Sequence, residues 1–192
     1  MQKERLAAFS DGVFAIIITI MVLELKVPHE PTLAALAGVL PVFLSYVLSF
    51  VYIAIYWNNH HHLLHAAKRI NGPIMWANMH LLFWLSLIPF STGWMGENHF
   101  ASLPTALYGV SLLMPAIAYY VLQRAIIRHQ GNEGVLAKAL GADIKGKISP
   151  VLYLIAIVFA FFVPVIAGAI YVGVALMWLV PDRRIERMLD EH

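Results

Sequence analysis

Residues 9–24 read FSDGVFAIIITIMVLE, and this stretch decides the fold. The uncharged run between Asp11 and Glu24 has only twelve residues, 12–23. As an α-helix these residues span about 18 Å, well short of the ~30 Å hydrocarbon core of a bilayer. Polar groups inside a membrane must face protein or water. We therefore expect other helices to surround this segment, and we do not expect lipid on all of its sides.

The composition places the chain among integral membrane proteins. Hydrophobic residues make up 60% of its 192 residues and charged residues only 12%, whereas soluble domains carry about 25% charged residues. Cysteine is absent. This excludes a disulfide framework, a thiolate metal site and a cysteine nucleophile.

Apolar segments along the chain predict an all-α polytopic membrane protein with six transmembrane helices in a single domain, residues 1–192. The expected spans are 6–26, 33–65, 72–95, 103–128, 149–163 and 165–181. The second is too long for one crossing, so we expect a short external helix over 33–38 and a break near Pro41. The last two spans are separated by Pro164 and predict a tight hairpin.

Basic residues set the orientation. With six crossings and both termini in the cytoplasm, only Lys26 falls outside, as the positive-inside rule requires. The basic residues then inside are Lys3, Arg5, Lys68, Arg69, Arg124, Arg128, Lys138, Lys145, Lys147, Arg183, Arg184 and Arg187. We interpret the net charge of +2 as a result of this orientation in the cell (plasma) membrane, and not as a sign of nucleic-acid binding. Outside, Glu24, Glu30 and Glu97 indicate a mouth that favours cations.

The opening helix carries a regular stripe. Ile16, Thr19, Ile20 and Leu23 recur at i, i+3, i+4 and i+7, and Asp11 points roughly opposite. Periodicity alone also fits ordinary core packing. Polar groups on several faces of this helix favour a functional role for the stripe.

Other polar residues fall at a matching depth near the cytoplasmic side. Ser10 and Asp11 belong to the first span, His60 to the second and Asn78 to the third. A buried carboxylate needs partners, so we expect Asp11 to form a network with Arg5, Ser10, His60 or Asn78. Arg5 and Asp11 do not face each other on one helix. Their direct pairing requires a non-helical entry or a second chain.

Several motifs resemble the transmembrane protein 175 family, cation channels whose bacterial members have six spans. The first combines Arg5 with Phe9-Ser10-Asp11-Gly12-Val13, Ala15-Ile16 and Thr19. Others are YWNNHH at 56–61, NMHLLFWLSLIPF at 78–90, FFVPV at 161–165 and LVPDRRIER at 179–187. The resemblance therefore extends over most of the chain.

This resemblance implies a homotetramer whose first helices line one central pore. The implied hydrophobic constriction consists of Ile16, Ile20 and Leu23. Thr19 is implied in potassium preference, with the permeating ion passing near it. The implied helix-anchoring residues are Arg5, Phe9, Ser10 and Asp11, with Trp57, His60 and Asn78 as their partners.

The sequence thus predicts a potassium-preferring cation channel, not an enzyme, whose partners are its own copies, the lipid bilayer and monovalent cations. No cofactor is expected beyond potassium as the permeant ion. One alternative is a small proton-coupled or cation secondary transporter in which Asp11 and His60 relay protons. Transporters usually show paired repeats, and this chain shows none. A non-conducting membrane scaffold is a third possibility.

Three weaker patterns suggest other functions. The run His60 to His62 with His65 contains an i, i+4 pair, but adjacent histidines point in different directions and no carboxylate is near, which argues against a metal site. Ser10 beside Asp11 is not a triad arrangement, which argues against a hydrolase. The segment STGW at 91–94 superficially resembles a carbonyl filter, and because it follows Pro89 we interpret it as a helix end.

Overall fold

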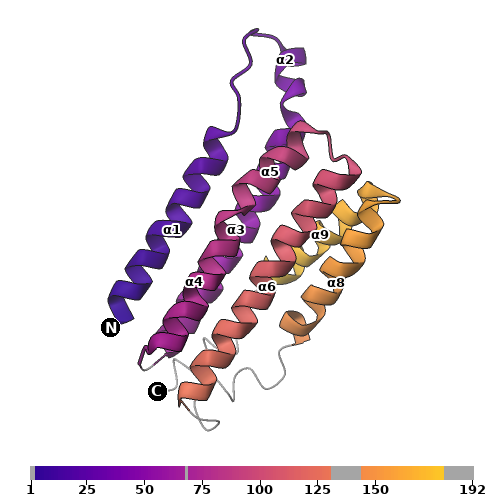
Figure 1. Ribbon diagram of the computed structural model, residues 1–192. Helices are drawn as coiled ribbons and strands as arrows, with labels where there is room; N and C mark the ends of the chain where they lie inside the picture. The colour runs from indigo at the N-terminus through magenta and orange to yellow at the C-terminus, as the bar shows by residue number, and fades with distance from the viewer. Residues whose placement is uncertain (1–2, 68, 131–143, 180–192) are drawn as a thin grey trace.

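The computed structural model describes residues 3–67, 69–130 and 144–179, and within these ranges the regular structure is entirely helical (Figure 1). The helices are α1 (Lys3–Leu23), α2 (Leu33–Gly38), α3 (Leu40–Ala66), α4 (Gly72–Ser86), α5 (Ile88–Glu97), α6 (Ser102–Gln130), α8 (Ile144–Ala160) and α9 (Pro164–Leu179). The expected all-α class is confirmed. The basic residues Lys68, Lys138, Arg183, Arg184 and Arg187 lie outside the described residues.

The break expected near Pro41 is confirmed. Thr32 caps α2 by accepting a hydrogen bond from the amide of Ala35 at 3.2 Å. The helix ends at Gly38, and α3 begins at Leu40 with Pro41 in its first turn, where a missing N–H leaves no bond unmade. The short helix α2 and the long helix α3 are therefore separate elements.

The third span is divided into α4 and α5, which meet at Leu87. Pro89 stands in the first turn of α5, so the proline begins a helix here and does not end one. Residues 91–94 consequently lie inside α5, with Ser91 and Thr92 buried. The expectation that this segment is a helix end was wrong.

Among the residues that the structure describes, four stretches are long and apolar enough to cross a membrane: Lys3–Leu23, Leu40–Ala66, Gly72–Glu97 and Ser102–Gln130. The helices α8 and α9 have 17 and 16 residues, or about 26 and 24 Å, and form the expected hairpin around 161–163. Helix α8 begins at Ile144, before the start expected at Ser149. Trp178 of α9 donates to the Ser149 hydroxyl at 2.9 Å and ties the two helices together.

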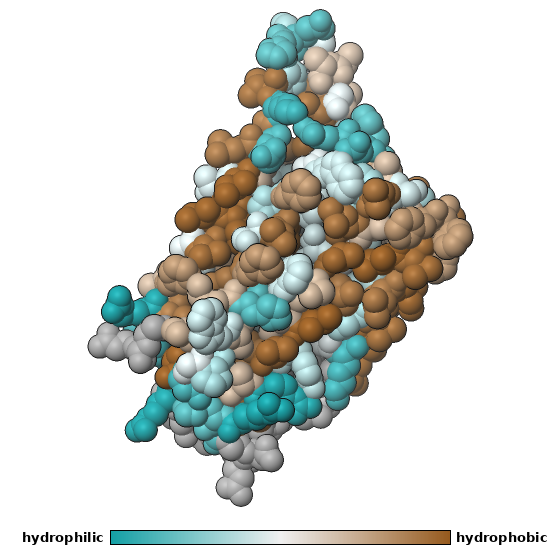
Figure 2. Space-filling model, in the orientation of Figure 1, coloured by the Kyte–Doolittle hydropathy of each residue, from teal (hydrophilic) through white to brown (hydrophobic). Residues whose placement is uncertain are grey.

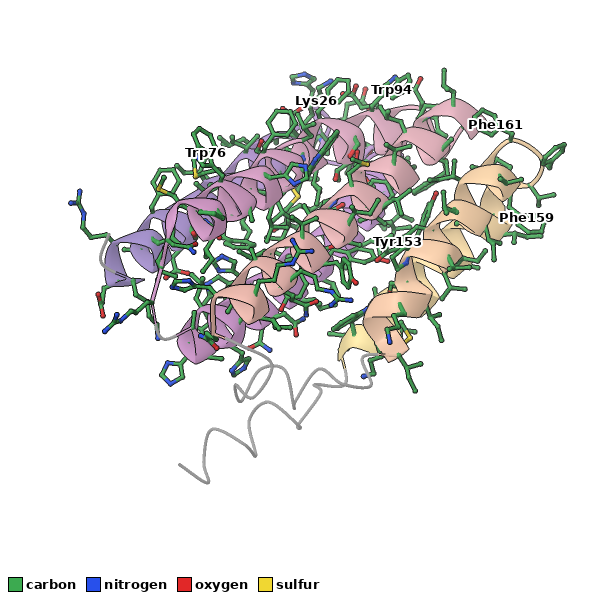
Figure 3. The ribbon with its side chains drawn as sticks, turned by 60° about the horizontal axis from the view of Figure 1, so that its bottom comes forward. Lys26, Trp76, Trp94, Tyr153, Phe159 and Phe161 are labelled. Carbon is green, nitrogen blue, oxygen red and sulfur yellow. The ribbon has the colours of Figure 1, made fainter. Side chains whose placement is uncertain are left out.

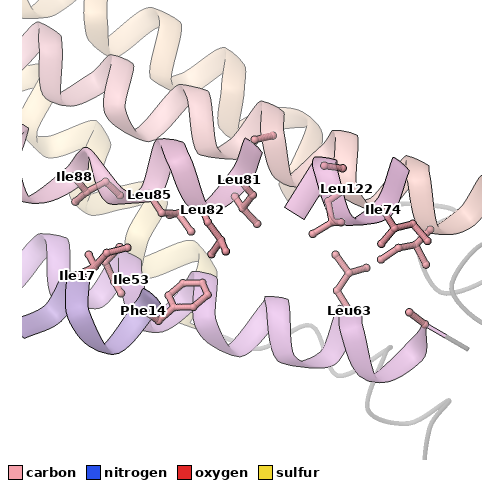
Figure 4. Close-up of a cluster of buried hydrophobic side chains, with 14 of the residues drawn as sticks. Phe14, Ile17, Ile53, Leu63, Ile74, Leu81, Leu82, Leu85, Ile88 and Leu122 are labelled. Atoms are coloured by element: carbon pink, nitrogen blue, oxygen red, sulfur yellow. The ribbon is translucent and has the colours of Figure 1, made fainter. Parts of the chain in front are cut away.

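The hydrophobic core joins α1, α3, α4, α5 and α6 (Figure 4). Phe14 and Ile17 of α1 meet Ile53 of α3 and Leu85 of α4, all at most 2% exposed. Helix α1 stands at the edge of the bundle (Figure 1). One chain therefore covers one side of α1 and leaves its other side open. Figure 2 shows a largely apolar surface between hydrophilic ends, as a membrane protein requires.

Candidate functional site: the uncovered face of α1

The stripe on α1 lies on the face that its own chain leaves uncovered. Ile16 is 59% exposed, Ile20 43% and Leu23 75%, and Thr19 is exposed with them. The opposite face of the helix is buried: Phe14, Ile17 and Met21 are each 2% exposed. The structure therefore brings the four stripe residues together on one surface that faces away from the bundle.

Thr19 keeps its oxygen available on this surface. Its hydroxyl donates to the carbonyl of Ala15, one turn earlier, at 2.9 Å. Because the hydroxyl hydrogen is used within the helix, the lone pairs of Oγ1 remain as acceptors. Thr19 can thus offer oxygen to a cation at this surface.

A buried polar network fixes the N-terminal half of α1. The Asn78 amide donates to Ser10 Oγ at 3.0 Å, and its carbonyl oxygen lies 2.6 Å from His60 Nε2. The three side chains are at most 1% exposed. Because Asn78 Oδ1 only accepts, His60 donates through Nε2. Three different helices, α1, α3 and α4, are therefore held in one rotational register.

Asp11 stands outside that network. Its Oδ1 accepts a hydrogen bond from Trp57 Nε1 at 2.9 Å, and both side chains are exposed. The expected bonds of Asp11 with Arg5, Ser10, His60 or Asn78 are absent among the described residues, because Ser10 turns into the bundle and Asp11 does not. Arg5 and Phe9 are also exposed, on the same side of α1 as Ile16. The predicted anchoring residues therefore divide into a buried set and a surface set.

The segment that follows the C-terminal end of α1 is tied to α5 by an ion pair that was not predicted from the sequence. Lys26 Nζ donates to Glu97 Oε1. This hydrogen bond and the charge of Glu97 raise the pKa of Lys26 above its usual range, and the charge of Glu24 adds to the effect. The signal in the sequence was the opposite charge of two residues expected outside, but their distance along the chain concealed the pairing.

A second buried network was also missed. Ser49 of α3 bonds to Thr92 of α5 at 2.7 Å and to the Tyr108 hydroxyl of α6 at 2.9 Å. These side chains are at most 4% exposed. Hydroxyl residues scattered through apolar spans carry no spacing that predicts such a meeting. The network links the helices behind α1.

The histidine run diverges. His60 points inward to Asn78, whereas His61 is exposed and stacks on His65 with ring centroids 6.4 Å apart. No group of three or more His, Asp or Glu side chains that could hold a metal occurs in the part of the chain that the structure describes.

Comparisons with known proteins identify the family. Residues 5–89, which contain both sets of predicted anchoring residues, match the family model described as endosomal/lysosomal potassium channel TMEM175. A potassium channel of Chryseobacterium sp. (strain P1-3) is 55% identical over 192 residues, all of both chains. A potassium channel of Streptomyces collinus is 32% identical over 129 residues, which cover 63% of this chain and 63% of the relative.

A solved structure has the same fold. It is the crystal structure of a lysosomal potassium-selective channel TMEM175 homolog from Chamaesiphon minutus, 28% identical. The match has a TM-score of 0.81 and covers 94% of this chain and 97% of the other. The resemblance found in the sequence motifs is confirmed, and the chain belongs to the TMEM175 family.

Proposed function

We propose that the protein is a potassium-preferring cation channel of the cell membrane, a homotetramer with both termini in the cytoplasm. The uncovered face of α1 is the observation that carries this proposal. It presents Thr19 and Asp11 at its surface, at depths where lipid contact is unfavourable for polar groups. Further copies of the chain around an axis beside α1 remove that contact. All six spans then act as one channel domain.

Four copies of α1 enclose an axial path. Rings of Ile16, Ile20 and Leu23 around that path oppose ion entry by dewetting, so the pore leaks slowly and opens through small rotations of α1. A ring of Thr19 hydroxyls supplies oxygen atoms to a partly dehydrated potassium ion. Potassium is the substrate of transport here, and the mechanism uses no cofactor or catalytic group.

The buried network supports this arrangement. A rotation of α1 by one residue, about 100°, would replace the stripe at the axis by other side chains. The bonds from Ser10 to Asn78 and from Asn78 to His60 hold α1 against such a rotation. We assign to these three residues the role of anchoring the pore helix, and to Arg5, Phe9, Asp11 and Trp57 a role at the subunit contacts.

Potassium preference has two supports. The relatives from Chryseobacterium and Streptomyces are named potassium channels, and the solved structure is titled potassium-selective. Glu97 and Glu24 also lie close to Lys26 at the expected outer mouth, and Glu30 belongs to the same segment between α1 and α2. This excess of negative charge raises the local cation concentration.

A proton-coupled transporter has weaker support. His60 bonds to Asn78, and Asp11 bonds to Trp57, so the two groups that a relay needs belong to separate sets. A steady ionic current is expected from a channel, whereas a carrier is expected to give coupled uptake without such a current.

The test is planar-bilayer recording of the purified protein with potassium on one side and sodium on the other. A steady current whose reversal potential is shifted from zero toward the equilibrium potential of potassium supports the channel. The variant Ile16→Asn, recorded in parallel, must change the size of that current, because a contaminating channel would not respond. Silent bilayers together with substrate-coupled uptake into liposomes would contradict the proposal and favour the carrier.

A further inference from the structure

The exposed arc of α1 is wider than the stripe. Beyond Ile16 and its neighbours it includes Ala8, Asp11, Ala15 and Val22, all exposed. On a helical wheel these four lie about 80–140° from Ile16. If Ile16 faces the axis, as the proposed function requires, this second sector faces sideways, and its alanines allow close approach of a neighbouring helix.

Asp11 offers an open acceptor in this sector. Trp57 of α3 occupies Oδ1, and no described residue bonds to Oδ2, so the carboxylate retains acceptor capacity. Asp11 is the eighth residue after Lys3, about 12 Å from the cytoplasmic end of α1. At that depth a free carboxylate oxygen needs a donor.

His80 of α4 offers a matching donor. Its Nε2 accepts a hydrogen bond from Trp84 Nε1 at 2.9 Å. An indole N–H only donates, so the neutral imidazole carries its proton on Nδ1, and no described residue accepts it. His80 is exposed on the side of α4 opposite the buried Asn78. It is the eighth residue after Gly72, also about 12 Å from the cytoplasmic end of its helix.

The donor and the acceptor belong to two different surfaces of one chain. His80 lies in an aromatic stripe on α4 and α5 with Trp76 (71% exposed), Phe83 (55%) and Phe90 (67%), which we term the α4–α5 flank. Figure 3 shows Trp76 and Trp94, towards opposite ends of this stripe, projecting from the bundle.

The opposing surface, the α1–α3 flank, carries Asp11 and Trp57 together with Phe50 and Phe43 of α3, each at least 41% exposed. Both α3 and the α4–α5 pair pack against α1. A ring of identical subunits joins two different patches at each contact. These two flanks have matching depth, aromatic character and hydrogen-bonding groups.

We propose that, in the tetramer, the α1–α3 flank of one subunit packs on the α4–α5 flank of the next, and that Asp11 accepts a hydrogen bond from Nδ1 of His80 of the partner subunit. This inference rests on the proposed homotetramer and assigns its contact surfaces. Each contact satisfies one carboxylate oxygen and one imidazole N–H that a single chain leaves facing outward. Repeated at every interface, it sets which face of α1 points to the axis.

Cysteine cross-linking tests the contact directly, because the natural chain has no cysteine. The double variant Asp11→Cys/His80→Cys is treated in detergent with a short thiol-reactive cross-linker and separated under denaturing conditions. We expect bands of dimer, trimer and tetramer from the double variant and monomer from each single variant. The matched control Asp11→Cys/Val158→Cys, whose second cysteine lies exposed on the peripheral helix α8, stays monomeric. A dimer band from Asp11→Cys alone would place Asp11 at the axis and overturn the proposal.

A second pair of cysteine substitutions tests the same contact between flanks while keeping Asp11. Phe50 of α3 is ten residues before His60 and Leu87 is nine residues after Asn78, so both lie about 14–15 Å above the buried network on opposite flanks. Phe50→Cys/Leu87→Cys should conduct potassium before treatment and form the same ladder after it. A tetramer by light scattering that conducts potassium but cross-links through neither pair overturns the flank assignment and leaves the proposed function intact. A wild-type monomer overturns both.

Discussion

Substitution of Asn78 by leucine is the sharpest test of the buried network. Leucine has the same number and branching of side-chain heavy atoms as asparagine, so the change removes hydrogen bonds without opening a cavity. Two bonds are lost, to Ser10 at 3.0 Å and to His60 at 2.6 Å. Interhelical hydrogen bonds in membranes average about 0.6 kcal/mol each, and a buried donor left unpaired costs about 1–3 kcal/mol. Ser10 keeps its bond to the Leu6 carbonyl at 2.8 Å, so the stranded His60 N–H dominates. We expect a loss of about 2–4 kcal/mol in the free energy of unfolding.

The measurement is unfolding of the purified protein in mixed micelles, followed by circular dichroism as the fraction of denaturing detergent rises. The matched control is Ser86→Ala on the same helix. Ser86 is exposed and donates only to the Phe83 carbonyl of its own helix at 2.7 Å, so its loss should cost less than about 0.5 kcal/mol. If Asn78→Leu and Ser86→Ala unfold at the same detergent fraction, the network does not hold α1 in place.

Three further changes have defined outcomes. Ile16→Asn should hydrate the constriction and raise the leak current in bilayers, and an unchanged current from assembled protein would remove this residue from the pore. Thr19→Val keeps the shape and removes the oxygen, so the permeability ratio of potassium to sodium should fall. An equal ratio in variant and parent would place selectivity elsewhere. Gly109→Ala adds a methyl group that meets the Tyr171 hydroxyl and should destabilise the fold by about 1–3 kcal/mol. Gly173→Ala, where the added group meets nothing within 4 Å, is its matched control in thermal melts, and equal melting temperatures would refute the packing argument.

Most of the fold follows from local signals in the sequence. Pro41 marks the start of α3 and Pro164 the start of α9, because proline fits the first turn of a helix. The same residue type misled at Pro89, because there too the proline stands in the first turn of a new helix, α5, which continues to Glu97. A proline thus locates a helix boundary, but the sequence alone does not say whether a helix ends or begins there.

The site could be predicted only in part. The stripe of Ile16 and its neighbours was visible because the period of an α-helix alone puts these residues on one face. The partner of Asp11 was not, because adjacent residues on a helix point about 100° apart: Ser10 turns into the bundle, and Asp11 turns toward Trp57. Depth along the membrane normal could be read from the sequence, but rotation about each helix axis required the packed bundle.

The central claim, that the uncovered stripe of α1 lines the ion path, is tested most directly by cysteine accessibility in the open channel. The natural chain lacks cysteine, so single variants Ile16→Cys, Leu23→Cys, Val22→Cys and Ile17→Cys can be recorded in bilayers before and after a small thiol-reactive cation is added. We predict block at Ile16 and Leu23. We predict no block at Ile17, which is 2% exposed, or at Val22, which is 44% exposed but about 120° away from Ile16 on the helical wheel. Block at Val22 with none at Ile16 would contradict the account, because the axis would then face a different side of α1.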